Sequence, residues 1–212
     1  MLSHTRWGIR VAVASAALVL ASCGGDDSTA TSETTTTVVT TTSSTEVVSA
    51  EDFEALVVAP PAPFAQQPDD VIETGLMEVG NPASGTIGIG FAQEKDLVDA
   101  GMQRGWEKYF RASDDRSVII HVFEFEDESG PTAMMTRFRA TRDPAFTPYV
   151  VDGVSGSAGF RGTSPQGHDG RLAEVASGRF LMGVVVSGNP GSADLDAITE
   201  DLLQRQLEAL PQ

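Results

Sequence analysis

The sequence predicts an α+β fold, in which an antiparallel sheet of about five or six strands packs against helices in a single domain. Three observations lead to this class. In the second half of the chain, runs of β-branched and aromatic residues alternate with turn-forming residues, as the strands of a sheet do. Segments with apolar residues at helical spacing lie before, between and after these runs. A threonine-rich segment without apolar periodicity precedes the whole region.

Residues 1–22 have the pattern of a secretory signal peptide. Two arginines among the first ten residues precede an apolar run, residues 11–21, which is too short to span a bilayer. The run ends in LASC, residues 20–23, which resembles the lipobox of bacterial lipoproteins. In that family the cysteine thiol receives a diacylglyceryl group, the preceding peptide is removed, and the new N-terminus is acylated. The resemblance implies cleavage between Ser22 and Cys23 and lipidation of Cys23.

Lipidation fixes the expected location of the protein. Cys23 is the only cysteine in the chain, so no internal disulfide can form. One acyl chain binds a membrane marginally and two hold it stably, at about 0.8 kcal/mol for each buried methylene. We therefore expect an anchor in the cell membrane, with the protein on the extracytoplasmic face. The alternative is an ordinary signal peptide that contains Cys23 by chance and is cleaved nearby.

Residues 23–50 are predicted to be a lipidated, disordered linker. Ten threonines lie between Thr29 and Thr45, and the segment contains no aromatic residue. Such a composition buries too little apolar surface to offset the entropy lost on ordering. The linker should therefore hold the globular domain, residues 51–212, clear of the bilayer.

The charge of the chain excludes one class of partner. There are 30 acidic and 14 basic residues, for a net charge of −16. Phosphate backbones and anionic headgroups repel such a surface, so we expect no nucleic-acid partner. Solubility is the simplest explanation of the charge, and a cationic partner is the sharper alternative.

The first half of the domain is predicted to begin with a helix at residues 50–58. Ser49 is a suitable N-cap for it, and the proline-rich residues 59–64 end it. A strand is expected at residues 85–91. A short helix follows at residues 93–101.

A β-hairpin is the clearest pattern in the chain. Two stretches rich in β-branched and aromatic residues, 103–112 and 117–126, flank the turn formers 113–116. Both faces of the second strand are largely apolar: Ile119, His121, Phe123 and Phe125 on one, and Val118, Ile120 and Val122 on the other. We therefore expect this strand to lie in the centre of the sheet.

The second half of the domain begins with a helix at residues 127–143, capped by Asp127 or Ser129. Pro144 and Pro148 then break the chain. Three more strands are predicted: residues 156–163, 170–177 and 179–188. The last helix should follow Ser192, its predicted N-cap, and carry an apolar stripe: Leu195, Ile198, Leu202 and Leu210.

This order of segments resembles that of actinobacterial cell-envelope lipoproteins. It is similar in particular to Lpq-type lipoproteins of PsbP-like fold and to the extracellular sensor domains of mycobacterial Ser/Thr kinases. The resemblance implies a binding or accessory module and transfers no site residue. It also implies internal disulfides in the kinase domains, from which this chain departs because no cysteine follows Cys23. That departure favours the PsbP-like alternative.

The histidines offer little for catalysis. His4 leaves with the signal peptide, and His121 is expected to be a core residue of its strand. Ser155, His168 and Asp169 are a conceivable Ser-His-Asp combination. The sequence GVSGS around Ser155 lacks the second glycine of a nucleophile elbow, and the strand-turn-helix context is missing.

Metal and cofactor sites are not predicted. The segment EFEDES contains carboxylates suited to calcium (Glu124, Glu126, Asp127 and Glu128). It lacks EF-hand spacing, and an adjoining helix N-terminus explains the acids. Gly85, Gly88 and Gly90 do not form a dinucleotide motif. We expect no metal and no cofactor.

The function expected from these observations is that of a non-enzymatic lipoprotein that binds a small ligand or an envelope protein. An apolar groove beside Met134, Met135 and Phe138 is the first place to look for a ligand, because methionine adapts to varied partners. The simpler interpretation is that these three residues fill the core. The competing hypothesis is an envelope hydrolase with an unrecognised active site.

Overall fold

The computed structural model describes residues 49–69, 74–78, 94–140, 145–192 and 194–211. All of them belong to one compact unit, Glu46–Gln212. The predicted signal peptide, the lipobox with Ser22 and Cys23, residues 23–48 of the linker and the predicted strand at 85–91 lie outside the described residues. The last two residues of the predicted linker, Ser49 and Ala50, instead cap and begin the first helix.

Eight strands and four helices make up the described part. The strands are β1 (Ala65–Gln66), β2 (Gly75–Glu78), β3 (Met102–Arg111), β4 (Ser117–Phe125), β5 (Phe146–Tyr149), β6 (Ala158–Thr163), β7 (Asp169–Ser177) and β8 (Phe180–Gly188). The helices are α1 (Ala50–Ala55), α2 (Glu94–Asp99), α3 (Ser129–Ala140) and α4 (Leu195–Ala209).

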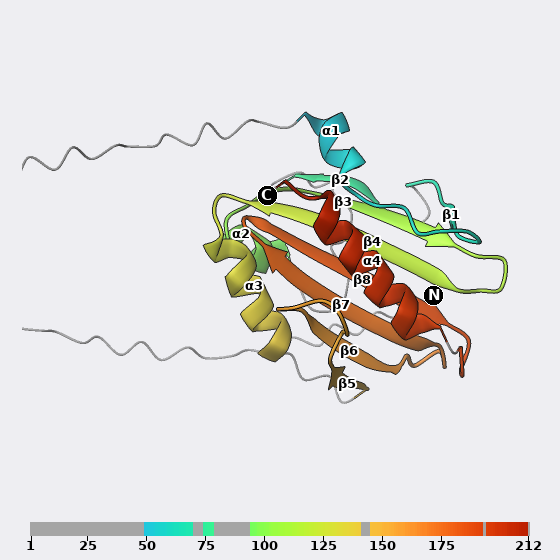
Figure 1. Ribbon diagram of the computed structural model, residues 1–212. Coiled ribbons are helices and arrows are strands. Elements are labelled where there is room, and N and C mark those ends of the chain that lie inside the picture. Colours follow the sequence, from blue (N-terminus) through green and yellow to red (C-terminus); the bar gives the residue numbers. More distant parts are fainter. Residues whose placement is uncertain (1–48, 70–73, 79–93, 141–144, 193, 212) are drawn as a thin grey trace, which may run out of the picture. The chain divides into compact units, whose positions relative to one another are not determined.

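The strands form one antiparallel sheet in the order β1-β3-β4-β8-β7-β6-β5, and β2 also pairs with β3 (Figure 1). This confirms the α+β class. The strand number is higher than predicted, because the sequence-based count of five or six missed β1, β2 and β5. The predicted hairpin is present, with Arg111 opposite Ser117, and β4 lies centrally between β3 and β8.

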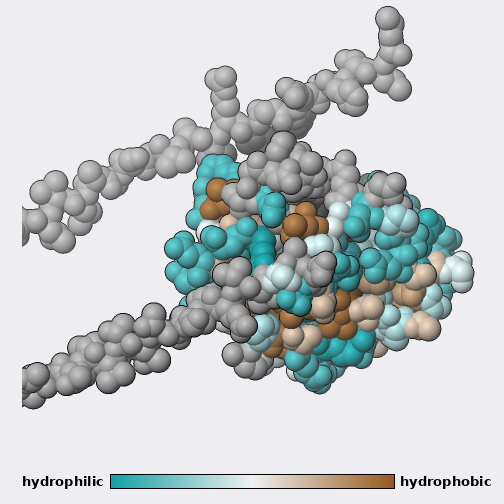
Figure 2. Space-filling view, turned by 90° about the horizontal axis from the view of Figure 1, so that it is seen from above, coloured by the Kyte–Doolittle hydropathy of each residue, from teal (hydrophilic) through white to brown (hydrophobic). Residues whose placement is uncertain are grey.

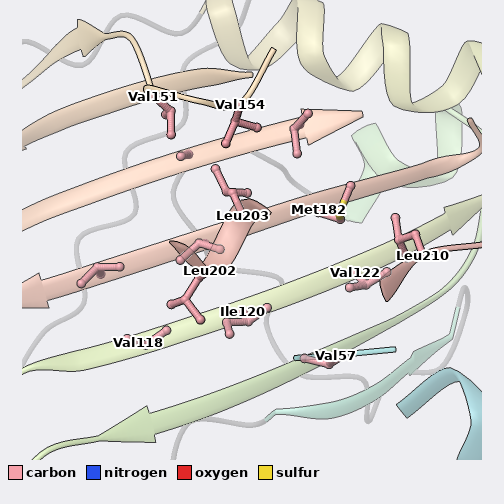
Figure 3. Packing of buried hydrophobic residues seen from close by; sticks show 14 of the residues in the cluster. Val57, Val118, Ile120, Val122, Val151, Val154, Met182, Leu202, Leu203 and Leu210 are labelled. Atoms are coloured by element: carbon pink, nitrogen blue, oxygen red, sulfur yellow. The ribbon is translucent and has the colours of Figure 1, made fainter. Parts of the chain in front are cut away.

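One face of the sheet packs against α4, which crosses the central strands in Figure 1. Leu195, Leu202 and Leu203 of α4 are buried in the main apolar cluster. The β4 side chains on this face are Val118, Ile120 and Val122, as the alternation predicted. Figure 3 shows these side chains together.

The opposite face packs against α3 and carries a second and a third apolar cluster. Phe123 and Phe125 of β4 contact the helix residues Met134 and Met135 in the second cluster. Phe138 packs edge-on against Phe160 of β6, with ring centroids 4.9 Å apart. Both faces of β4 are therefore covered, which explains its apolar sequence.

The helix starts follow the sequence except at α4. Ser49 accepts a hydrogen bond from the Asp52 amide, and the Asp127 carboxylate accepts one from the Ser129 amide. The prediction that Ser192 caps the last helix is wrong. Its hydroxyl donates to the Asn189 carbonyl within the preceding turn, so the helix starts later, after Asp194.

The prediction that Pro148 breaks the chain is also wrong, because β5 contains it. Among the described strands, β5 pairs with β6 alone and lies at the edge of the sheet. A proline is tolerated there because an edge strand has backbone groups that need no partner strand.

Candidate functional site

An open cavity of about 260 Å³ lies beside α4. It is lined by Tyr149 at the end of β5, by the following loop, by Arg161 of β6 and by two acids of α4; the other lining residues are Val150, Val151, Asp152, Asp196 and Glu200. Its wall therefore combines one aromatic ring, one guanidinium and three carboxylates.

The loop between β5 and β6 is held in place by burial of its apolar residues. Val151 and Val154 are 3% and 5% exposed, and Figure 3 shows them beside Leu203 of α4. Gly153 has φ +74°, a left-handed conformation that favours glycine. A Cβ atom there would lie 3.0 Å from Glu200 Oε1, so the glycine also lets the loop pass close to this cavity residue.

Tyr149 owes its position to a glycine on the neighbouring strand. It pairs with Gly159, and a Cβ atom on Gly159 would lie 2.6 Å from Tyr149 Cε1. The ring therefore lies against the backbone of β6. Arg161, two residues further along β6, places its guanidinium 5.9 Å from the ring centroid. This is a cation–π distance.

The charges of the cavity are only partly compensated. Asp196 forms an ion pair with Arg171 of β7. Arg161, Asp152 and Glu200 form no ion pair within the described ranges. Burial raises the pKa of Tyr149 to about 12, against an opposing effect of the Thr199 hydroxyl, so the phenol is neutral at physiological pH.

The cavity rim also carries an exposed apolar side chain. Hydrophilic residues predominate on the face that Figure 2 shows, and hydrophobic ones form small patches between them. Among the described residues, Val150 is 82% exposed and Val98 is 42% exposed. Val150 therefore offers an apolar contact next to the charged lining.

A second polar feature is buried in the opposite face of the sheet. Glu107, His121, Gly183 and Glu174 stand opposite one another on β3, β4, β8 and β7. His121 is 2% exposed, and its Nε2 lies 3.8 Å from Glu174 Oε1. Neither ring nitrogen has a hydrogen-bond partner in the described part of the chain.

Burial controls the protonation of this row. It raises the pKa of Glu174 to about 8 and that of Glu107 to about 7, and it lowers the pKa of His121 to about 3. A neutral histidine beside protonated carboxyl groups avoids buried charge. The two glutamates lie three strand spacings apart, about 14 Å, so they cannot share one ion with His121. In the residues described, no cluster suited to a metal ion is found.

The structure does not bring the Ser-His-Asp combination together. Ser155 precedes β6, whereas His168 and Asp169 follow it, at the other end of the strand. The Asp169 carboxylate accepts hydrogen bonds from the Thr163 hydroxyl and the Gly191 amide. His168 belongs to the turn, where its amide donates to the Ser164 hydroxyl.

The EFEDES acids have separate structural roles. Glu124 is 5% exposed and lies between two guanidinium groups, with its oxygens 2.6 Å from Arg104 Nε and 2.5 Å from Arg179. Asp127 caps α3, and this hydrogen bonding lowers its pKa. Glu126 and Glu128 are exposed, and no metal-ion cluster is found at this segment among the described residues.

The apolar helix residues fill the core. Met134, Met135 and Phe138 are 3%, 4% and 3% exposed. A shallow groove of about 480 Å³ lies between α2 and α3, and Met134 is the one of the three that lines it. The predicted groove is therefore present, but it belongs mainly to Ala100, Ala133 and the polar residues around them.

Sequence reasoning missed every residue of the cavity beside α4. Tyr149, Arg161 and Glu200 come from three elements separated in the chain. The only local signals are the GxxGxxG-like spacing of Gly153, Gly156 and Gly159 and the run YVVD before it. Neither indicates a site without the fold. No helix among the described residues is long and apolar enough to cross a bilayer.

The chain resembles a solved structure in fold, although not in sequence. No protein-family model matches the chain, and no curated protein matches it in sequence. Among solved structures, the crystal structure of the extracellular domain of PknH from Mycobacterium tuberculosis superposes with a TM-score of 0.52 and 11% identity. The match covers 76% of this chain and 97% of that one. The two share a fold.

The likeness to the PknH domain bears on the two families that the sequence resembles. In fold, the chain is similar to the extracellular domain of PknH, although the sequence favoured the PsbP-like alternative because no cysteine follows Cys23. The PknH domain is extracellular by its description. At 11% identity the likeness establishes the fold and transfers no site residue.

Proposed function

We propose that this chain is a lipid-anchored binding module on the extracytoplasmic face of the cell membrane, and that it acts by binding and not by catalysis. Three observations support the proposal. The LASC sequence at residues 20–23 fits a lipidated N-terminus. The fold is similar to that of the extracellular domain of PknH. An open, charged cavity lies on this frame.

The cavity beside α4 carries the binding part of the proposal. Small-molecule sites are concave and combine apolar or aromatic walls with a few polar groups that fix orientation. Tyr149 and Val150 supply the first kind of contact, and Arg161, Asp152 and Glu200 the second. The sheet and α4 hold Tyr149, Arg161 and Glu200 on rigid elements, which lowers the entropy cost of binding.

The absence of convergence at the histidines supports binding over hydrolysis. A nucleophile, its base and the group that orients the base must lie within hydrogen-bond reach of one another. Ser155 and His168 lie at opposite ends of β6. His121 lacks a hydrogen-bond partner in the described residues and faces Glu174 from inside the sheet.

Native mass spectrometry of the protein, purified from membranes in mild detergent, tests the binding proposal. We expect a bound small molecule or a co-purifying envelope protein that depends on the cavity. Gly159→Ala should release it, because the added Cβ displaces Tyr149. Gly170→Ala is the matched control, since its Cβ would meet only ordinary contacts at 3.9 Å. The proposal fails if no molecule co-purifies with the protein, or if every co-purifying molecule binds Gly159→Ala and Gly170→Ala equally.

The anchoring part has its own test. Cys23→Ala removes the only thiol, so the variant should be released from the membrane fraction or remain unprocessed. Full membrane retention of a normally processed Cys23→Ala protein would contradict lipid anchoring, and it would leave the binding measurement unaffected.

A further inference from the structure

Opposite charges line the cavity beside α4 without neutralising one another. Arg161 lies on the β6 side, Asp152 on the loop and Glu200 on the helix. The closure of an ion pair between neighbouring side chains needs only a rotamer change. None of the three has an ion-pair partner among the residues described, although all line the same hollow.

Each of the remaining cavity groups is already engaged. The Tyr149 ring contacts the Arg161 guanidinium, with 5.9 Å between the guanidinium and the ring centroid, and this contact does not neutralise the positive charge. Asp196 is paired with Arg171. The free charges that face the hollow are therefore one cation and two carboxylates.

We propose that the cavity binds a small zwitterion, such as a free amino acid, with its carboxylate on Arg161 and its ammonium group between Asp152 and Glu200. The inference rests on the proposed binding function and names its ligand class. The guanidinium can hold a carboxylate through two parallel hydrogen bonds, and an ammonium group donates three. A single molecule with both charges bridges the groups that the protein keeps apart.

The size of the cavity fits this class. About 260 Å³ is room for roughly nine water molecules at about 30 Å³ each. A simple amino acid has a comparable number of non-hydrogen atoms. Val150, 82% exposed at the rim, is available to contact an apolar side chain of the ligand.

Ligands with one charge are a poorer match. A simple cation would satisfy the two carboxylates but would leave Arg161 beside a like charge, and a simple anion would face Asp152 and Glu200. Electrostatic complementarity of this kind supplies specificity more than affinity. The cavity should therefore discriminate by charge pattern.

Isothermal titration of the full-length protein in detergent tests the inference with L-alanine as the probe. Acetate and ethylammonium, which each carry one of its two charges, are the comparison ligands. We expect saturable binding of L-alanine. Acetate and ethylammonium should each bind at least roughly tenfold more weakly than L-alanine.

Variants assign the two ends of the ligand. Arg161→Gln should weaken L-alanine binding roughly tenfold and leave ethylammonium binding unchanged or stronger. Glu200→Gln should weaken both. The matched controls are Arg111→Gln, at the tip of the β3–β4 hairpin, and Glu208→Gln, on the exposed side of α4; neither should change binding.

Two results would overturn the inference. One is ethylammonium binding as tight as L-alanine binding and insensitive to Arg161→Gln, which would make the cavity a simple cation site. The other is no saturable L-alanine binding. In either case the comparison of Gly159→Ala with Gly170→Ala still tests the proposed function, because native mass spectrometry detects any co-purifying ligand and not only a zwitterion.

Discussion

The imidazole of His121 lies directly over Gly183 of the neighbouring strand. A Cβ atom on Gly183 would come within 2.0 Å of Nε2, so the glycine provides the space that the ring occupies. The ring also stacks on Phe123, with centroids 4.8 Å apart, and reaches toward Glu174 on the strand beyond. A bulky polar side chain thus fits inside an apolar face because the strand beside it has no side chain there.

Gly183→Ala should destabilise the protein by roughly 1–3 kcal/mol, because overpacking forces the ring and the strand apart. His121→Ala in the same chain should recover part of the loss, which gives a favourable coupling in a double-mutant cycle. Chemical denaturation measures both. Gly170→Ala, whose Cβ meets nothing closer than 3.9 Å, is the control. If Gly183→Ala and Gly170→Ala changed the stability equally, the ring would not fill the space over Gly183.

The buried row predicts an unusual dependence of stability on pH. The pKa values of Glu174 and Glu107 are about 8 and about 7 in the folded state, against an ordinary 4.5. Between pH 4.5 and the folded-state pKa of each glutamate, the folded state keeps a proton that the unfolded state has lost, so stability falls as pH rises. His121, with a folded pKa of about 3 against 6.5, acts in the opposite sense below pH 6.5.

From pH 6.5 down to pH 4.5, the two protons that the folded glutamates retain outnumber the one proton that unfolded His121 gains, so stability rises as pH falls. Below pH 4.5 only His121 still differs in protonation between the folded and unfolded states, so stability falls again. These three groups therefore favour maximal stability near pH 4.5. Above pH 6.5, each proton that the folded state holds and the unfolded state has lost lowers the free energy of unfolding by about 1.4 kcal/mol per pH unit. The predicted pH dependence follows the total number of bound protons, so it does not change if the proton shared by His121 and Glu174 lies on the imidazole instead of the carboxylate.

Denaturation at a series of pH values checks this dependence. Glu174→Gln cannot ionise, so its stability should fall less steeply than that of the parent protein from pH 4.5 to 8. Glu78→Gln replaces an exposed carboxylate at the end of β2 and should keep the parental slope. A parental slope in Glu174→Gln would mean that Glu174 is not protonated in the folded state.

Glu124 should be far more sensitive than its acidic neighbours. Its carboxylate is buried between Arg104 and Arg179, so Glu124→Gln removes the negative charge that both guanidinium groups contact. Removal of one partner from a buried ion pair costs roughly 3–5 kcal/mol. Glu128→Gln, in the same acidic segment but exposed, should have little effect on the midpoint of thermal unfolding. Similar midpoints for both variants would contradict the assigned role of Glu124.

Gln206 joins α4 to the segment after α1. Its Oε1 accepts a hydrogen bond from the Val58 amide at 2.9 Å, and its Nε2 donates one to the Leu56 carbonyl at 2.5 Å. Gln206→Ala leaves both backbone groups without this partner, at a cost of roughly 1–3 kcal/mol. Hydrogen exchange should accelerate at residues 50–58. The exposed Gln204→Ala is the control, and unchanged exchange in Gln206→Ala would argue against the link.

The sequence predicted the centre of the sheet better than its edges. The four predicted helices and the strands β3, β4, β6, β7 and β8 are present, because their apolar periodicity reflects burial. Each of the missed strands β1, β2 and β5 pairs with only one other strand in the described part of the chain. Such strands are short and can contain residues like Pro148, so their composition resembles that of a loop.

The candidate site was less predictable than the fold. Arg161 of β6 and Glu200 of α4 line one cavity only because the fold brings these separate elements to the loop after Tyr149. Gln206, a buried polar residue, breaks the apolar stripe of α4 and gave no sign of its partner. Contacts between distant segments leave no periodicity in the sequence, whereas the burial of a strand or a helix face does.

Mass spectrometry of the N-terminal peptide of the membrane-extracted protein tests the central claim most directly. Lipid anchoring predicts that the mature chain begins at Cys23 and that this residue carries a diacylglyceryl group on its sulfur and an acyl chain on its amine. A chain that begins elsewhere, or an unmodified Cys23, would contradict the account of an anchored extracytoplasmic module.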